Sequence, residues 1–352
     1  MKLKVAVITA DTEFMRRLAR IFQQNYQEKV SLYLFSNPET MYQSLQENHV
    51  ELLLIDQDME LNSREIPEGI TAGCLTKIPD AREVNGLPAV CKYQKAESIY
   101  KDMLSIYAES SANIRLKKGD SSARIILFMS AQGGCGTSSA AVAYALRRAQ
   151  EKKRVFYLTM ERFGNTEIYF KGDGNLSFSD VIYSLKSKNS NLQMKLESAV
   201  QTDESGVEFL KDCKNAYDIF ELTDDETREL IEGIRQVRKY DEIILDFSSD
   251  LWSRMISLAD SEADKIVYVS DGTMTGNHKF EKFCQAARIL ERRKNYQILD
   301  KTSLLYNRYS SSNSIQMEKT AVPVIGGIHR IEGISGKELA GKIAQMDCMS
   351  SI

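Results

Sequence analysis

The segment that most constrains the fold joins an apolar run, a glycine-rich loop and an alanine-rich helical run over residues 124–150. The loop reads Ser130-Ala131-Gln132-Gly133-Gly134-Cys135-Gly136-Thr137-Ser138-Ser139. Glycines let backbone N–H groups approach an anion, and the N-terminus of the following helix adds partial positive charge. The order strand, loop and helix therefore predicts a cradle for the phosphates of a nucleotide.

One cation is missing from this loop. A standard phosphate loop carries a lysine directly before its Ser or Thr, and Thr137 occupies that position here. Binding can still use the backbone N–H groups and the hydroxyl of Ser138, whereas hydrolysis loses a charge that stabilises its transition state. We therefore expect nucleotide binding with weak or absent hydrolysis, and whether the protein is an enzyme stays open. The alternative is a vestigial loop that binds nothing.

The length, the net charge and the cysteines limit the classes to which the protein can belong. A chain of 352 residues suggests two domains, each with its own core. The net charge of −3 gives no electrostatic case for a nucleic-acid partner. The six cysteines form no CxxC pair, which indicates reduced thiols in a cytoplasmic protein. No segment approaches the ~20 apolar residues that span a bilayer, so we expect no strong membrane anchor.

From residue 124 onward, buried-type apolar runs alternate with runs of helical period. This pattern predicts an α/β fold in which helices cover a mainly parallel sheet. The expected strands are 125–129, 155–158, 243–245, 266–269, 303–306 and 322–325, with helices near 138–150, 224–238 and 279–293. The expected domains are residues 1–112 and 124–352, joined by a polar linker at 113–123.

An aspartate ends the apolar run Ile243-Ile244-Leu245-Asp246. Beside a phosphate loop, an aspartate at the end of a strand can hold Mg²⁺, usually through water. The alternative is an aspartate that caps the next turn, which is common in α/β proteins. We favour magnesium, with Ser138 as a direct ligand and Asp246 behind it.

These segments together resemble the ParA/MinD superfamily of P-loop ATPases. The resemblance rests on the loop 132–138, on Tyr240-Asp241 leading to Asp246, on Asn307-Arg308 after a strand, and on the segment 321–328. It implies a three-layer P-loop NTPase domain that binds ATP with Mg²⁺ and forms a homodimer around the nucleotide. The segment 321–328 would close over the base.

The resemblance also implies a role for each matching residue. Backbone donors to the phosphates would come from Gly133, Gly134, Gly136 and Thr137, and Cys135 would occupy the variable position of the loop. Ser139 would touch the α-phosphate. Asn307 and Arg308 would contact adenine, the asparagine by hydrogen bonds and the arginine by stacking.

Several positions depart from the family pattern. The family's signature lysine is Gln132, which can hydrogen-bond across a dimer but carries no charge. The acidic pair after the second strand survives only as Glu161. The segment after Asp246 reads Phe247-Ser248-Ser249-Asp250 and lacks the family's glycine. These losses again predict slow or absent turnover.

The first 110 residues show a shorter α/β alternation. Strands are expected at 3–8, 30–35 and 52–55, and helices at 13–25, from Pro38 onward and at 96–107. The pattern resembles a flavodoxin-like response-regulator receiver domain. Asp56 matches the phospho-accepting aspartate, Thr76 the switch hydroxyl and Lys92 the lysine after the last strand.

The receiver pattern is incomplete. Ala10 fills the first place of the acidic pair that holds Mg²⁺, Asp11 fills the second, and Tyr93 follows Lys92 where the family has proline. We therefore favour a receiver-shaped interaction or dimerisation module. Phosphorylation at Asp56 is the alternative.

A receiver-like domain followed by a degenerate ParA/MinD-type domain resembles the pilus-assembly proteins of the CpaE/TadZ type. This resemblance implies a cytoplasmic, ATP-binding localisation factor for a tight-adherence (Flp) pilus secretion system, concentrated at a cell pole. Its partners would be a second copy and proteins of the secretion machinery. The segment 337–346 has helical spacing but few cations and no aromatic residue, which predicts a packed final helix and not a membrane-binding one.

Two other functions stay open. One is an active ATPase of the partition or division-site type, which turnover sensitive to Asp246→Ala would support. The other is a phosphorelay response regulator, which labelling by acetyl phosphate that is lost in Asp56→Asn would support.

Overall fold

The computed structural model describes residues 2–59, 61, 67, 69–79, 81–110, 123–187, 191–247, 252–310 and 312–352. By their internal contacts, the residues form two compact units. The first unit is Met1–Arg115 with Ser187–Ser198, and the second is Leu116–Lys186 with Ala199–Ile352. The expected linker at 113–123 lies outside the described residues except for Ala123.

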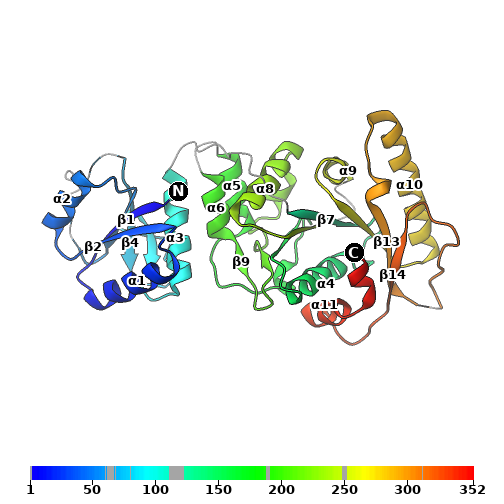
Figure 1. Cartoon of the computed structure of the whole chain (residues 1–352), viewed down its shortest axis with the longest axis horizontal. Coiled ribbons are helices and arrows are strands. Elements are labelled where there is room, and N and C mark those ends of the chain that lie inside the picture. Colours follow the sequence, from blue (N-terminus) through cyan, green and yellow to red (C-terminus); the bar gives the residue numbers. More distant parts are fainter. Residues whose placement is uncertain are drawn as a thin grey trace. The chain divides into compact units, whose positions relative to one another are not determined.

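The first unit contains a parallel sheet with one short antiparallel edge strand (Figure 1). Its strands are β1 (Leu3–Ile8), β2 (Val30–Phe35), β3 (Leu52–Asp56), β4 (Thr71–Thr76), β5 (Glu83–Val84) and β6 (Leu87–Cys91). Their order is β2-β1-β3-β4-β6-β5, and all but β5 pair in parallel. The first five positions give the order of a flavodoxin-like doubly wound sheet, so the predicted receiver fold is confirmed.

The helices of this unit begin where the sequence carries caps. They are α1 (Thr12–Asn25), α2 (Pro38–Glu47) and α3 (Ala96–Ser110). Asp11 accepts the backbone N–H of Phe14 at the start of α1, and Asn37 accepts that of Glu39 at the start of α2. The apolar residues spaced along α1 are buried against the sheet with those of α3, so the helical period predicted the correct face.

A segment from later in the chain completes the first unit. Helix α6 (Leu192–Ala199) provides Lys195, whose Nζ donates to Ser105 Oγ at 2.9 Å and pairs with Glu109 at 2.6 Å. The backbone N–H of Asn191 donates to the carbonyl of Ala108 at 3.1 Å. The expected boundaries assigned this segment to the C-terminal domain, whereas its contacts place it with α3.

The second unit is built on an eight-stranded sheet in the order β14-β13-β12-β7-β11-β8-β10-β9 (Figure 1). The strands are β7 (Arg124–Met129), β8 (Val155–Thr159), β9 (Gln201–Thr202), β10 (Glu208–Phe209), β11 (Glu242–Asp246), β12 (Lys265–Ser270), β13 (Thr302–Tyr309) and β14 (Val324–His329). All pair in parallel except β9, which is antiparallel to β10. Every residue of β8 and β11 is buried, as in a sheet covered on both faces. The predicted α/β class with a mainly parallel sheet is confirmed.

The helices of this unit are α4 (Thr137–Gln150), α5 (Phe178–Lys186), α7 (Tyr217–Phe220), α8 (Asp224–Val237), α9 (Trp252–Ser261), α10 (Met274–Lys294) and α11 (Gly336–Ala344). Of these, the sequence analysis did not assign α5, α7 and α9. Helix α10 begins at its cap Thr273, one turn before the apolar spacing becomes visible in the sequence. Strand β14 begins after Pro323 and not at residue 322, because proline has no N–H to donate to a ladder.

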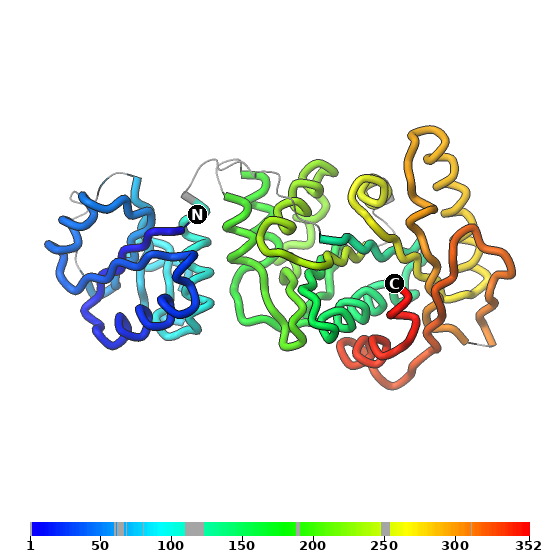
Figure 2. Tube along the Cα trace, in the orientation of Figure 1, coloured from blue at the N-terminus to red at the C-terminus, as the bar shows by residue number. Residues whose placement is uncertain are grey.

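Helix α11 packs against α4, as the sequence predicted for the last helix. Figure 2 shows the red C-terminal segment beside the blue-green α4, although the two segments are far apart in the sequence. Ala340, Ile343 and Ala344 of α11 are buried in the same core as α4. Among the described residues, no helix combines the length and the apolar composition needed to cross a membrane.

Candidate nucleotide-binding site

The glycine-rich loop connects β7 to α4 at the carboxyl end of the sheet. Strand β7 lies between β11 and β12, so the loop leaves the middle of the sheet. Gly134 and Gly136 have φ values of 75° and 85°, which glycine adopts more readily than any residue with a side chain. Gly136 is also the N-cap of α4, so the loop feeds directly into a helix N-terminus. The local geometry is that of a phosphate cradle.

A cavity of about 270 Å³ opens over this loop. Its lining residues are Ser130, Gln132, Gly133, Gly134, Gly136, Thr137, Ser138, Ser139, Glu161, Asn165, Tyr169 and Phe247. Of the loop residues 132–139 that were predicted to bind the nucleotide, only Cys135 is absent from this lining. Its buried Sγ lies 3.2 Å from the carbonyl of Gln132 and 3.6 Å from that of Val269, so the side chain faces away from the cavity.

The hydroxyl of Ser138 and the carboxylate of Glu161 meet at one end of the cavity, and the buried carboxylate of Asp246, which is not among the lining residues, lies next to them. Ser138 Oγ donates to Glu161 Oε1 at 3.1 Å. Asp246, fully buried at the end of β11, accepts from the hydroxyl of Tyr157 at 2.8 Å through Oδ2. Burial, and then the charge of Glu161, raise the pKa of Asp246 to about 7. Ser138, Glu161 and Asp246 thus lie close together, and the binding of magnesium by Ser138 and Asp246 stays a prediction.

These oxygens are suited to a magnesium ion held jointly with a nucleotide. Asp246 Oδ1 is buried and has no hydrogen-bond partner, which is the position of an oxygen that awaits a cation or a water. Within the described part of the chain, no three His, Cys, Asp or Glu side chains are arranged to hold a metal. The remaining ligands would have to be phosphate oxygens and water, as is usual for Mg²⁺.

Two residues that line the cavity also carry buried, unpartnered oxygens. They are Gln132, through Oε1, and Asn165, through Oδ1. Gln132 donates its amide Nε2 to Asp271 at 2.8 Å, so its side chain is anchored by a neighbouring loop. Among the residues that the structure describes, no lysine, arginine or histidine lines the cavity. The site therefore offers acceptors and carboxylates, and a polyphosphate would need a cation to enter it.

Asn307 and Arg308 hold the loop from behind. Asn307 Nδ2 donates to the carbonyl of Cys135 at 2.9 Å and to that of Gly136 at 3.1 Å. Arg308 Nη1 donates to the carbonyl of Gly134 at 2.6 Å. The backbone of Arg308 itself has a positive φ of 54°. Neither side chain lines the cavity. Their contact with adenine stays a prediction, whereas their contact with the loop is direct.

Sequence analysis missed Asn165 and Tyr169, which both line the cavity. The Tyr169 hydroxyl lies 3.2 Å from Ser139 Oγ, and burial raises the pKa of this tyrosine. Both follow Glu161 by less than ten residues, in the loop after β8. In a parallel sheet the loops after neighbouring strands meet at one edge, and this rule could have pointed to them. Residues 248–250, where the family has its glycine, lie outside the described residues.

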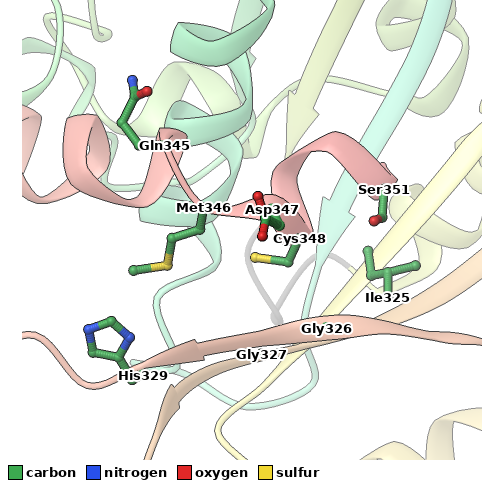
Figure 3. Close-up of a pocket in the computed structure, with 9 residues that line it drawn as sticks. All are labelled: Ile325, Gly326, Gly327, His329, Gln345, Met346, Asp347, Cys348 and Ser351. Carbon is green, nitrogen blue, oxygen red and sulfur yellow. The ribbon is translucent and has the colours of Figure 1, made fainter.

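A second cavity, of about 520 Å³, lies between β14 and the C-terminal 3₁₀ helix Asp347–Ser351. Figure 3 shows Met346 and Cys348 between the C-terminal segment and the strand that carries Gly326 and Gly327. A Cβ on Gly326 would lie 2.6 Å from the Cβ of Cys348, so the strand and the segment are in close contact. Gly326 and Gly327 belong to the segment expected over the base, yet they line this cavity and not the one over the loop.

In the first unit, the predicted receiver residues Asp56 and Lys92 form a buried ion pair. Lys92 Nζ lies 2.7 Å from Asp56 Oδ2, and the two residues are 1% and 3% exposed. Thr9 donates its hydroxyl to the same oxygen, and the N–H of Asp58 donates to Oδ1 at 3.3 Å. Both oxygens of the expected phospho-acceptor are therefore occupied. Thr76, the expected switch hydroxyl, donates to Gln57 at 2.5 Å.

Comparisons with known proteins agree with this geometry. Residues 1–108 match the model of the family "TadZ-like, receiver domain". Among solved structures, a ParA family ATPase from Chlorobium tepidum TLS superposes with a TM-score of 0.51 at 17% identity. That alignment covers 65% of this chain and 96% of the other. No curated protein sequence matches the chain.

Two further structures are similar at lower scores. A putative plasmid partition protein from Borrelia burgdorferi B31, bound to AMPPNP, has a TM-score of 0.45 at 15% identity, over 65% of this chain and 94% of that one. The MinD cell division protein of Aquifex aeolicus has a TM-score of 0.46 at 15% identity, over 63% and 95%. The chain thus joins a TadZ-like receiver domain to a domain with the ParA/MinD-type P-loop ATPase fold, which is the domain arrangement of the CpaE/TadZ-type proteins.

Proposed function

We propose that the protein is an ATP-binding localisation and assembly factor for a tight-adherence (Flp) pilus secretion system, with weak or no hydrolysis. The observation that carries the nucleotide part is the cluster of Ser138, Glu161 and Asp246 beside a glycine-rich loop, with one carboxylate oxygen buried and unpartnered. The TadZ-like receiver domain supports the pilus assignment.

Different residues of the site would bind the phosphates and the magnesium ion of Mg–ATP. Backbone N–H groups of Gly133, Gly134, Gly136 and Thr137 would donate to the phosphates, and the N-terminus of α4 adds partial positive charge. Ser138 and Asp246 would hold the magnesium ion, which neutralises phosphate charge when it is bound. Asn307 and Arg308 keep the loop in shape through its carbonyls. Each role uses a group that the fold already fixes in place.

The same site is poorly equipped for hydrolysis. Phosphoryl transfer is accelerated by cations that face the transferring group, and Thr137 and Gln132 stand where lysines would supply them. Because no cation of the described residues lines the cavity, the protein would stabilise the bound nucleotide more than the transition state. Long-lived ATP occupancy follows.

Occupancy without turnover suits a localisation factor. Mg–ATP would stabilise one arrangement of a homodimer by mass action, and proteins of the secretion machinery would bind that form in the cytoplasm at a cell pole. The receiver domain, with its aspartate engaged in an ion pair, would act as an interaction module and not as a phosphorelay input.

The test is to incubate the purified protein with Mg–ATP, desalt it, and identify the retained nucleotide by chromatography over several hours. Intact ATP is expected in the wild type and a large loss in Asp246→Ala. Asp241→Ala, directly before the first residue of β11, is the matched control and should retain ATP. Retained ADP with released phosphate would indicate a cycling ATPase, and no nucleotide above background would contradict the proposal.

A further inference from the structure

Three exposed aromatic side chains of the second unit form a cluster, here called the aromatic patch: Phe163, Tyr217 and Phe220. Their exposed fractions are 77%, 61% and 40%. The rings of Phe163 and Phe220 meet edge to face at 6.2 Å between centroids, and those of Tyr217 and Phe220 stack at 5.8 Å. Contiguous exposed aromatic surface is uncommon on soluble proteins and marks interaction sites.

Two arginines, the buried Arg254 and the partly exposed Arg162, order the platform under the aromatic patch. Arg254, on α9, donates Nη1 to the carbonyl of Ile219 at 3.3 Å and Nη2 to that of Leu222, which fixes helix α7 from behind. Arg162 lies with its guanidinium carbon 4.3 Å from the centroid of the Phe220 ring. Rings held in place before binding lose little entropy when a partner covers them, so they are effective anchors.

The aromatic patch and the nucleotide cavity share one loop. Glu161 and Asn165 line the cavity, whereas Arg162 and Phe163, between them in sequence, contact Phe220. Glu161 accepts the hydroxyl of Ser138, so an ion or nucleotide that engages these groups acts on the same short loop. Residues that line the cavity and residues that contact the aromatic patch therefore lie within five consecutive positions of the chain.

The other end of this loop is tied to the segment before α7. The carboxylate of Asp212 accepts the backbone N–H of Thr166 at 3.1 Å and that of Glu167 at 3.3 Å. A Cβ on Gly164 would lie 2.5 Å from Asp212 Oδ1, so the loop passes directly over this carboxylate. The loop and α7 therefore form one packed surface.

The rim of the aromatic patch is acidic. Asp218 and Glu221 flank Phe220, and among the described residues neither side chain forms an ion pair. The next acidic residues along the chain do form ion pairs: Asp224 with Arg254, Asp225 with Arg228, and Glu226 with Lys186. Lys186 Nζ donates to the backbone carbonyl of Glu221 at 2.9 Å, which leaves the carboxylates of Asp218 and Glu221 without an ion pair in the described part of the chain. Apolar anchors beside such carboxylates fit a partner that presents apolar side chains flanked by lysine or arginine.

We propose that the aromatic patch docks a basic amphipathic helix of a partner protein, and that the nucleotide cavity controls this docking through the loop 161–165. The apolar face of the helix covers Phe163, Tyr217 and Phe220, and its cations pair with Asp218 and Glu221. The control by nucleotide rests on the proposed function, whereas the docking surface does not.

The test uses two fluorescein-labelled helical peptides of 18 residues (about five turns), one of leucine and lysine with leucine along one face, the other with glutamate in place of lysine. Fluorescence anisotropy with the full chain is measured without nucleotide and with Mg–AMPPNP. The lysine peptide should bind at least tenfold more tightly than the glutamate peptide. Two double variants should each weaken the binding of the lysine peptide about tenfold. Phe163→Ala/Phe220→Ala removes two aromatic anchors, and Asp218→Asn/Glu221→Gln removes two charge pairs.

Matched controls separate the aromatic patch from general stickiness. Tyr93→Ala removes an aromatic ring of the first unit that is 61% exposed, the same fraction as Tyr217, and should not change peptide binding. Thermal melts should coincide for all variants. Equal binding to the wild type and to Phe163→Ala/Phe220→Ala would overturn the proposal, as would equal binding of the two peptides.

Separate readouts distinguish this proposal from the proposed function. Mg–AMPPNP should change the peptide affinity several-fold in the wild type, and an unchanged affinity despite bound nucleotide would overturn the control by the cavity. Peptide binding that depends on the aromatic patch in a protein that retains no nucleotide would overturn the proposed function and leave the docking surface standing. Self-association in sedimentation velocity that Phe163→Ala/Phe220→Ala abolishes would overturn the partner helix in favour of a second copy.

Discussion

Gly136 and Asn307 are in such close contact that no side chain fits between them. A Cβ on Gly136 would lie 2.3 Å from Nδ2 of Asn307, which donates to the carbonyls of Cys135 and Gly136. An asparagine at the end of β13 thereby sets the shape of a loop more than 170 residues earlier in the chain. Any change at either residue therefore acts on the nucleotide cavity.

We predict that Gly136→Ala abolishes or severely weakens nucleotide binding. Alanine must adopt a φ of 85°, at a cost of about 1–2 kcal/mol, and must displace the Asn307 amide as well. The measurement is the affinity for a fluorescent ATP analogue with Mg²⁺. Gly206→Ala is the matched control, because Gly206 has nearly the same φ of 86° but no atom within 4 Å of its Cβ position, and it does not line the cavity. Equal affinities of the two variants would contradict the role of this contact.

A second prediction concerns the metal. The described residues that line the cavity include acceptors and a carboxylate but no cationic side chain, so ATP should bind only together with Mg²⁺. Removing Mg²⁺ with EDTA should lower the ATP affinity at least a hundredfold, because no cation would then offset the repulsion between the phosphates and the carboxylates of Glu161 and Asp246. Titration calorimetry with and without EDTA checks this. In Asp246→Asn the dependence on Mg²⁺ should weaken, and a wild type that binds ATP equally well in EDTA would contradict the assignment.

The sequence predicted the parts of the fold that depend on local pattern. Apolar runs placed the central strands, Pro38 placed the start of a helix, and the glycine-rich loop placed the cavity. These features could be predicted because strand burial, capping and phosphate binding each need particular residues at fixed spacing.

The parts that depend on distant contacts could not be predicted. Helix α6 lies within the sequence of the second unit but packs against α3 through Lys195, and no local pattern shows this. Asn165 and Tyr169 reach the cavity only because the loop after β8 lies beside the one after β7. Asn307 was assigned to adenine by resemblance, and its hydrogen bonds to the loop became visible only in three dimensions.

In the first unit, the ion pair of Asp56 and Lys92 should be structural. Lys92→Met should destabilise this unit by about 3–5 kcal/mol, because it leaves a buried carboxylate without its cation. The double variant Asp56→Asn/Lys92→Met should recover much of that loss. A double-mutant cycle from urea unfolding measures the coupling. Additive losses would show that the two side chains do not depend on one another.

The same carboxylate should resist phosphorylation. Both oxygens of Asp56 accept hydrogen bonds and its side chain is buried, so it is poorly placed to attack a phosphoryl donor. Intact mass spectrometry after incubation with acetyl phosphate and Mg²⁺ should show no adduct. An adduct of one phosphoryl group that is lost in Asp56→Asn would contradict this and support a phosphorelay role.

The final prediction concerns pH and Asp102 on α3. Burial raises the pKa of Asp102 to about 6 from its ordinary value of 3.8, although the amide of Gln94 donates to it at 2.6 Å. Between these two values the folded state binds the proton more tightly than the unfolded chain does. The contribution of this group to stability should therefore fall as the pH rises from about 4 to about 6, and stay low above that range.

Asp102→Asn tests this directly, because asparagine keeps the shape and carries no charge at any pH. The variant should gain stability relative to the wild type as the pH rises from 4 to 7, by an amount on the order of 1 kcal/mol. Urea unfolding at each pH measures the difference. Glu97→Gln, an exposed position on the same helix, is the control and should show no such trend. A constant difference between Asp102→Asn and the wild type across this range would show that the Asp102 carboxyl titrates as it does in water.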